Sequence, residues 1–175
     1  MIPKRTAVAL IFVLFVLPAA CATGVSQKAR SQVTYTGSFS GLQTDPDGHV
    51  DSVVMLGGKI LETKGSPTSS EIAILQLPLG TNHRPRDGDQ SEGRFLLHSG
   101  KFLDPAIYRD GTLLTVVGRV SGSELRPVGD FDYTYPVVES IEIKLWPKES
   151  PTGPGISLGV GVGSVGSGVG LGVGY

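Results

Sequence analysis

Cysteine is nearly absent from this chain of 175 residues, which contains only Cys21. A single cysteine cannot form an internal disulfide bond, so the chain is not a disulfide-stabilised domain. A surplus of positive charge is also missing, because 15 lysines and arginines face 16 acidic residues. Proteins that bind nucleic acid need an excess of basic side chains to neutralise phosphates, so we expect no nucleic-acid partner.

A long apolar run is missing as well. The longest run, Ala7–Leu17, covers 11 positions, whereas a helix that crosses a bilayer needs about 20 apolar residues. Lys4 and Arg5 precede this run, and the small residues 19–21 follow it. A basic, then an apolar, then a small segment is the order of a secretory signal, so residues 1–20 are predicted to be a signal peptide.

The cysteine lies where this signal ends. The segment 17–21 (LPAAC) resembles a lipobox, at which a bacterial signal peptidase cuts before a cysteine that carries diacylglycerol. We therefore expect Cys21 to be the lipid-attachment site and the membrane to be a partner through N-terminal acyl chains. Ala22, in place of an inner-membrane retention Asp, favours the outer membrane, where we expect the chain on the periplasmic face. Pro18 stands where a lipobox usually has leucine, which leaves open an ordinary cleavage that releases a soluble chain beginning at Thr23.

Residues 35–148 have the pattern of a small all-β domain, with short apolar runs between clusters of Gly, Pro, Asp and Ser. No stretch of helical length keeps a 3.6-residue apolar period. Because closure removes exposed strand edges, we expect a small OB-like barrel, with a small β-sandwich as the alternative. The predicted strands cover residues 59–63, 71–79, 93–98, 112–120 and 140–146.

Three local features refine this expectation. The Gly57-Gly58 pair predicts a bulge or a close approach of two backbones, and Gly118 in mid-strand predicts a bend of the barrel. Asp104-Pro105 predicts the start of a helical turn that ends near Gly111.

The two ends of the chain differ from this domain. Residues 21–34 comprise the acylated cysteine and a polar segment without a period, which we expect to be a flexible tether. Residues 149–175 form a Pro/Gly-rich, low-complexity tail that we expect to be disordered. The alternative for the tail is a strand that pairs through its bare backbone with a sheet edge or with another chain.

Charged residues concentrate in the loop Thr81–Glu92. His83 and Arg86 in this loop are suited to bind an anion or a partner, although ordinary solvated loops have the same composition. Arg94 and Asp104 are expected to form a structural ion pair, and an anion-binding role of Arg94 is the alternative. The histidines lie in separate segments, so no spacing predicts a metal site, and nothing indicates a cofactor.

Several stretches together, in this order and behind a lipobox, resemble the Slp family of outer-membrane lipoproteins from about Tyr35 to Trp146. They are Gly57–Ile60, Leu77–Leu79, Arg84–Pro85, Gly93–Phe95, Phe102–Pro105, Tyr108, Thr115–Gly118, Tyr135–Val138 and Leu145–Trp146. One departure is Val53–Leu56, where the family tends to have Arg-Trp.

The resemblance implies a lipoprotein of the Gram-negative outer membrane with a link to starvation or stress. The family has no established catalytic reaction, so we expect no enzyme, and only Cys21 takes over a defined role. A structural or interaction role with an envelope protein partner is the expected function. The alternative is a periplasmic binding module for a small envelope ligand or glycan, with Tyr133, Tyr135 and Trp146 as stacking surfaces.

Overall fold

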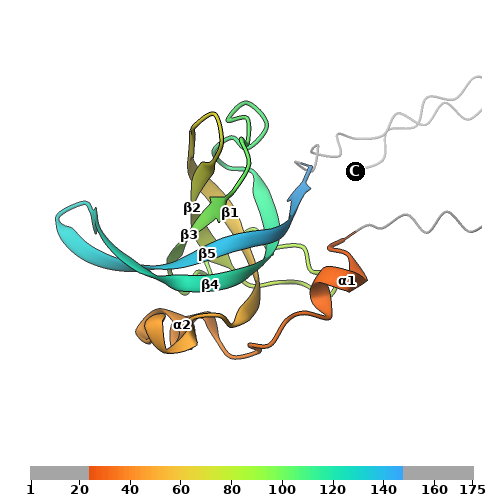
Figure 1. Ribbon diagram of the computed structural model, residues 1–175, viewed down its shortest axis with the longest axis horizontal. Helices are drawn as coiled ribbons and strands as arrows, with labels where there is room; N and C mark the ends of the chain where they lie inside the picture. The colour runs from red at the N-terminus through yellow and green to blue at the C-terminus, as the bar shows by residue number, and fades with distance from the viewer. Residues whose placement is uncertain (1–23, 148–175) are drawn as a thin grey trace, which may run out of the picture.

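The computed structural model describes residues 24–147, which form five strands and three short helical segments (Figure 1). The elements are α1 (Gln27–Arg30), α2 (Phe39–Thr44), η1 (Asp47–His49), β1 (Val53–Gly65), β2 (Ser70–Leu77), β3 (Arg94–Ser99), β4 (Leu113–Val128) and β5 (Phe131–Trp146). The expected all-β class is confirmed. The predicted signal peptide, Cys21 and the Gly-rich tail lie outside the described residues.

The five strands close into a barrel in the order β1-β2-β3-β5-β4. Neighbouring strands are antiparallel except for β3 and β5, which are parallel. A five-stranded Greek-key barrel is the architecture of the OB fold. The predicted OB-like barrel is therefore confirmed, and the β-sandwich alternative is wrong.

The barrel interior is filled by alternate residues of each strand, as the two-residue period of a strand requires. Ile72 and Ile74 of β2 and Phe95 of β3 are fully buried in this core. Helix α2 lies at one end of the barrel (Figure 1) and adds Phe39 and Leu42 to the same core. The rings of Phe39 and Phe95 lie 5.9 Å apart between centroids.

Glycines allow two close approaches between strands. A Cβ on Gly118 would lie 2.5 Å from the carbonyl oxygen of Glu139, and one on Gly58 would collide with β2. The β4–β5 register shifts next to Gly118, which confirms the predicted bend. In β1 the register shift lies between Ile60 and Glu62, so the glycine pair provides the close approach and not the bulge.

The segment before the barrel is not a free tether in its described part. Val25 and the α1 residue Ala29 are buried against Val53 of β1 and Val117 of β4. The prediction of a flexible segment over residues 21–34 is therefore wrong from residue 24 onward. A helix of four residues is too short to show a period, but its two buried apolar side chains are enough to dock it on the sheet.

Ser26 adds a polar attachment to this docking. Its hydroxyl accepts a hydrogen bond from the N–H of Ala29 and so caps α1. Its own N–H and hydroxyl donate to the Glu142 carboxylate at 2.7 and 2.5 Å. These bonds lower the pKa of Glu142 below its usual range, the hydroxyl contributing most. The chain is thus attached to β5 two residues after the first described residue.

The turn predicted at Asp104 exists but does not continue as a helix. Asp104 Oδ1 accepts a hydrogen bond from the N–H of Ala106 at 2.8 Å, and its carbonyl accepts from Ile107 and Tyr108, both at 2.9 Å. The turn is followed by Gly111, whose positive φ of 76° suits glycine.

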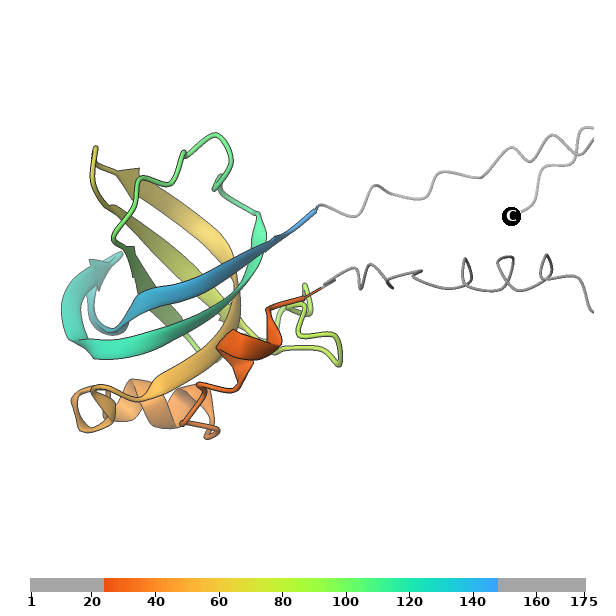
Figure 2. The same ribbon diagram turned by 45° about the vertical axis from the view of Figure 1, so that its right-hand side comes forward.

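Strands β4 and β5 are longer than predicted. Their far halves, residues 121–128 and 131–136, pair with each other and extend beyond the barrel wall as a hairpin (Figures 1 and 2). Within residues 24–147, no helix has the length and apolar character needed to cross a membrane.

Candidate functional site

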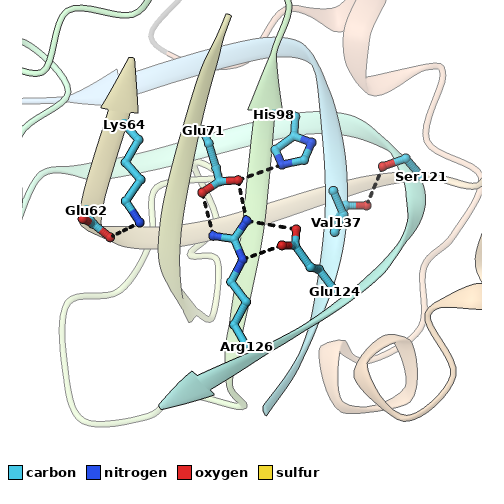
Figure 3. A network of polar contacts seen from close by, with 8 residues as sticks. All are labelled: Glu62, Lys64, Glu71, His98, Ser121, Glu124, Arg126 and Val137. Atoms are coloured by element: carbon cyan, nitrogen blue, oxygen red, sulfur yellow. Dashed lines mark hydrogen bonds and ion pairs between the residues drawn. The ribbon is translucent and has the colours of Figure 1, made fainter. Parts of the chain in front are cut away.

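The β4–β5 hairpin contacts β2 through Arg126 (Figure 3). The Arg126 guanidinium donates two hydrogen bonds to the two oxygens of Glu71 on β2, both at 2.6 Å. It also donates to both oxygens of Glu124 at 2.8 and 2.9 Å. His98 on β3 places its Nε2 3.2 Å from Glu71. We refer to Glu71, His98, Glu124 and Arg126 as the Arg126 cluster.

Two members of the cluster, Glu71 and Arg126, keep their charges at neutral pH. The hydrogen bonds from Arg126, followed by its positive charge, hold the pKa of Glu71 below its usual range despite partial burial. The bonds to Glu71 and Glu124 raise the pKa of Arg126 further above its ordinary value. Neither group is therefore suited to exchange a proton near pH 7. The cluster is a paired-charge contact between the hairpin and β2.

The same cluster has the spacing of a metal site but not its chemistry. Ligand atoms of Glu71, His98 and Glu124 lie within 4.8 Å of one another. Arg126, however, donates to all four carboxylate oxygens. A cation would have to displace the guanidinium, so the arrangement favours a structural ion pair over a metal centre.

A second apolar cluster lies where the hairpin meets β3. Leu96 of β3 is buried with Tyr135 and Val137 of β5, and Tyr133 packs against them. The Tyr133 hydroxyl accepts a 2.7 Å hydrogen bond from the N–H of Arg94. Burial raises the pKa of Tyr133, so this hydroxyl stays neutral. In OB folds the β2–β3 face commonly binds ligands; here the chain's own hairpin covers part of it.

The three aromatic residues predicted as stacking surfaces do not share one face. Tyr133 and Tyr135 contact each other edge to face, at 4.7 Å between centroids, on the side of the hairpin that packs against β3. Trp146 is buried at the far end of β5 and donates its indole N–H to Thr115 Oγ1 at 2.9 Å. The Thr115 hydroxyl in turn donates to the carbonyl of His83 at 2.6 Å. These side chains support the structure, which removes the basis for a three-ring binding face.

A groove of about 930 Å³ opens beside the end of β5. It lies between residues 80–87, residues 107–112 and the end of the described chain. Its lining includes Arg84, Arg86 and Arg109, whereas Asp87 is its one acidic residue within the described chain.

Two contacts organise the charges of this groove. Arg84 donates to the carbonyl of Pro147 at 3.0 Å, and its guanidinium lies 5.6 Å from the centre of the Trp146 ring. Asp87 forms an ion pair with Lys59. The acidic group of the groove is therefore neutralised from β1, and the groove carries a net positive charge.

The predicted site residues do not form one site. Arg86 lines the groove, whereas His83 contributes its backbone carbonyl to Thr115. The predicted Arg94–Asp104 ion pair is wrong, because the two residues lie at opposite ends of β3. Arg94 is the first residue of β3. Asp104 follows Leu103, whose N–H donates a hydrogen bond to Ser70, and Ser70 pairs with Ser99 at the last residue of β3. Cys21 lies outside the described residues.

The Arg126 cluster was not predicted. Its two main partners are 55 positions apart in the sequence, and they meet only because the hairpin lies over β2. Alternating charge at Glu124 and Arg126 was the available signal, but exposed strands commonly have this composition. The partner of each residue follows from the strand register, which a single sequence does not give.

The comparison with known families identifies the chain. The sequence model of the outer membrane lipoprotein Slp family matches residues 19–157. The chain belongs to the Slp family. The match covers the whole described barrel and begins two residues before Cys21.

Individual Slp-family relatives agree with this assignment. The chain is 28% identical to the outer membrane protein Slp of Escherichia coli over 79% of its own length and 73% of that protein. It is 31% identical to the uncharacterized lipoprotein YeaY of E. coli over 58% of this chain, and 34% identical to an uncharacterized protein of Haemophilus influenzae over 53%. These last two matches span about half the length of the relatives, 52% and 51%.

One solved structure overlaps with the barrel of this Slp-family chain. It is a mitochondrial single-stranded DNA-binding protein of S. cerevisiae, with a TM-score of 0.34 and 18% identity, over 54% of this chain and 92% of that chain. An overlap of this size carries no functional conclusion.

Proposed function

We propose that this protein is anchored by acyl chains on Cys21 to the periplasmic face of the outer membrane and acts there as a non-enzymatic interaction protein. Membership of an outer membrane lipoprotein family supports the location. The lipobox-like segment that ends at Cys21 supports the means of attachment. Acyl chains contribute about 0.8 kcal/mol per buried methylene, so two or more chains hold a protein on a membrane stably.

The β4–β5 hairpin is the observation that supports an interaction role. Near its tip Phe131 is 79% exposed and Leu125 is 64% exposed. Large apolar side chains with this exposure are common at protein–protein contacts, and aromatic residues often dominate their binding energy. The Arg126 cluster holds the hairpin against β2, so these side chains are presented on an ordered element.

The described groups whose pKa is shifted support a role without catalysis. The shifted pKa values of Glu71 and Glu142 are lowered, and that of Tyr133 is raised. Each shift moves the group away from neutrality, whereas a catalytic acid or base is tuned toward it. The hairpin also covers part of the β2–β3 face, which is the usual nucleic-acid platform of an OB fold.

Anchoring is tested in intact cells. We expect globomycin to block maturation, and mass spectrometry to find an acylated Cys21 at the mature N-terminus. A Cys21→Ser chain should be absent from the outer-membrane fraction. An unmodified chain beginning at Thr23 would contradict the proposal.

The interaction role is tested by photocrosslinking from the hairpin tip. A photoreactive residue at position 131 should give discrete adducts with an envelope protein, and Leu125→Ser should weaken them. Position 102 is the matched control, because Phe102 is also exposed but lies in another loop. Equal adducts from both positions would refute a role of the hairpin.

The proposal includes induction during starvation or stress, for which the family resemblance is the support. We expect the amount of protein to rise when cells enter stationary phase, measured by immunoblotting of the membrane fraction. A constant amount would remove this part and leave the anchoring proposal intact.

A further inference from the structure

The groove beside the end of β5 has cations available for an external ligand. Arg86 and Arg109 are exposed, and no side-chain hydrogen bond or ion pair engages either of them within residues 24–147. The acidic Asp87 is already paired with Lys59. The groove is thus positive on a chain whose formal net charge is −1.

The groove also lies beside the point where the membrane anchor begins. A Cβ on Gly24 would lie 3.5 Å from the carbonyl oxygen of Asn82, which lines the groove. Cys21 precedes Gly24 by three residues, so the chain between them spans at most about 11 Å. Helix α1 and the end of β5 lie on the same side of the barrel (Figures 1 and 2). An acylated Cys21 therefore keeps the groove close to the lipid headgroups.

Its remaining lining suits a membrane interface. Ile107 is 59% exposed at one wall, and Trp146 lies in the floor. An exposed apolar side chain beside basic residues is typical of surfaces that lie at the boundary between headgroups and acyl chains. Guanidinium groups bind phosphate through two parallel hydrogen bonds.

We infer that this groove contacts the membrane and binds the phosphate of anionic phospholipid headgroups. Arg86 and Arg109 bind the phosphate, while Ile107 lies against the glycerol region. The barrel then rests on the bilayer by its anchor side, with its orientation set by the groove. This inference rests on the proposed anchoring at Cys21, because the anchor supplies the proximity.

The test uses the mature chain, residues 21–175, with Cys21→Ser, so that binding does not depend on acyl chains. The protein is titrated in low salt with vesicles of phosphatidylcholine, either alone or with about 30 mol% phosphatidylglycerol as the anionic lipid. Trp146 is the only tryptophan in the sequence and lines the groove, so its fluorescence reports occupancy. Cosedimentation measures the affinity independently. We expect binding to the anionic vesicles alone, and its loss in high salt.

Variants locate the binding. One basic residue near an anionic surface changes affinity about 5-fold, so Arg86→Ala with Arg109→Ala should weaken vesicle binding about 25-fold. Lys64→Ala with Arg119→Ala removes the same charge from other exposed positions of β1 and β4 and should change it less than about 3-fold. All variants are first compared by circular dichroism, and the single arginine variants replace the double one if it does not fold.

Three results would overturn the inference: equal binding to neutral vesicles, equal losses in both double variants, or no loss in either. Inorganic phosphate alone provides a further arm. If it produces the full Trp146 signal and prevents vesicle binding at about physiological salt, the groove binds a soluble anion and not a membrane. Because this chain lacks Cys21, its results are separate from the globomycin test of anchoring.

Discussion

Replacing Arg126 with glutamine should release the hairpin from the barrel. The Arg126 and Glu71 side chains are 27% and 24% exposed, between a surface pair and a buried one. Exposed pairs contribute up to about 1 kcal/mol, and breaking a buried pair costs about 3–5 kcal/mol. We therefore expect a coupling of about 2 kcal/mol for this bidentate pair. Glu124 is 42% exposed, so solvent screening reduces its share to about 0.5 kcal/mol.

A double-mutant cycle measures this coupling. Urea unfolding of the wild type, Glu71→Gln, Arg126→Gln and the double variant is followed by circular dichroism and tryptophan fluorescence at pH 7. The Arg126 variant should lose about 2.5 kcal/mol, which corresponds to roughly 10 °C in Tm for a domain of this size. Glu124→Gln is the matched control. Hydrogen exchange should also become faster in residues 121–136 than in the barrel core.

The coupling should depend on pH in one direction. Hydrogen bonds from Arg126 hold the pKa of folded Glu71 below its value in the unfolded chain, which is about 4.3. The stabilisation is therefore complete above about pH 5 and is lost as the pH falls through the folded pKa. A coupling below about 0.5 kcal/mol at pH 7, or one that is unchanged at about pH 2, would refute the assigned pairing.

Three further predictions concern stability. Thr115→Val leaves the indole N–H of Trp146 and the carbonyl of His83 without their hydrogen-bond partner. It should lower the free energy of unfolding in urea by about 2 kcal/mol and shift the tryptophan emission. Unchanged values would show that the buried hydroxyl is dispensable. Gly118→Ala forces a Cβ toward a backbone oxygen and should cost about 3 kcal/mol of stability. Gly100 has open space around it, so Gly100→Ala should change stability by less than about 0.5 kcal/mol. Similar costs for the two variants would argue against the close approach. Ser26→Ala removes the α1 cap and the hydroxyl's hydrogen bond to Glu142, while the backbone N–H bond to Glu142 remains. It should cost about 1 kcal/mol, with faster hydrogen exchange in residues 25–33. Because the pKa of Glu142 is lowered by Ser26, that difference should shrink as the pH falls through the folded pKa, and a constant difference would contradict the bond.

The barrel strands could be predicted because burial on one side leaves an apolar alternation in the sequence. The hairpin halves of β4 and β5 could not, since both faces of residues 121–128 retain exposed or half-exposed side chains. The beginning of β1 was missed for the opposite reason. Val53 and Val54 are both buried, because α1 covers the outer face while the core covers the inner one. Two-sided burial removes the alternation that marks a strand.

The two helices were missed because helices of four and six residues are too short for a period. Ser26 and Ser38, which cap them, were the available local signals. The sequence showed Arg86 in a charged loop but could not bring Arg109 beside it. That placement depends on how the connection between β3 and β4 crosses the barrel.

The position of β5 has a consequence for the order of assembly. β5 is the last strand of the barrel in the sequence, yet it forms the seams with both β3 and β4. A chain emerging from its N-terminus therefore keeps two open strand edges until about residue 146 is free. Such late, long-range closure slows folding. A truncation within β5 would remove its pairing with both β3 and β4 and expose two strand edges at once. The C-terminal end of the domain therefore tolerates truncation poorly, although it is the end of the barrel sequence.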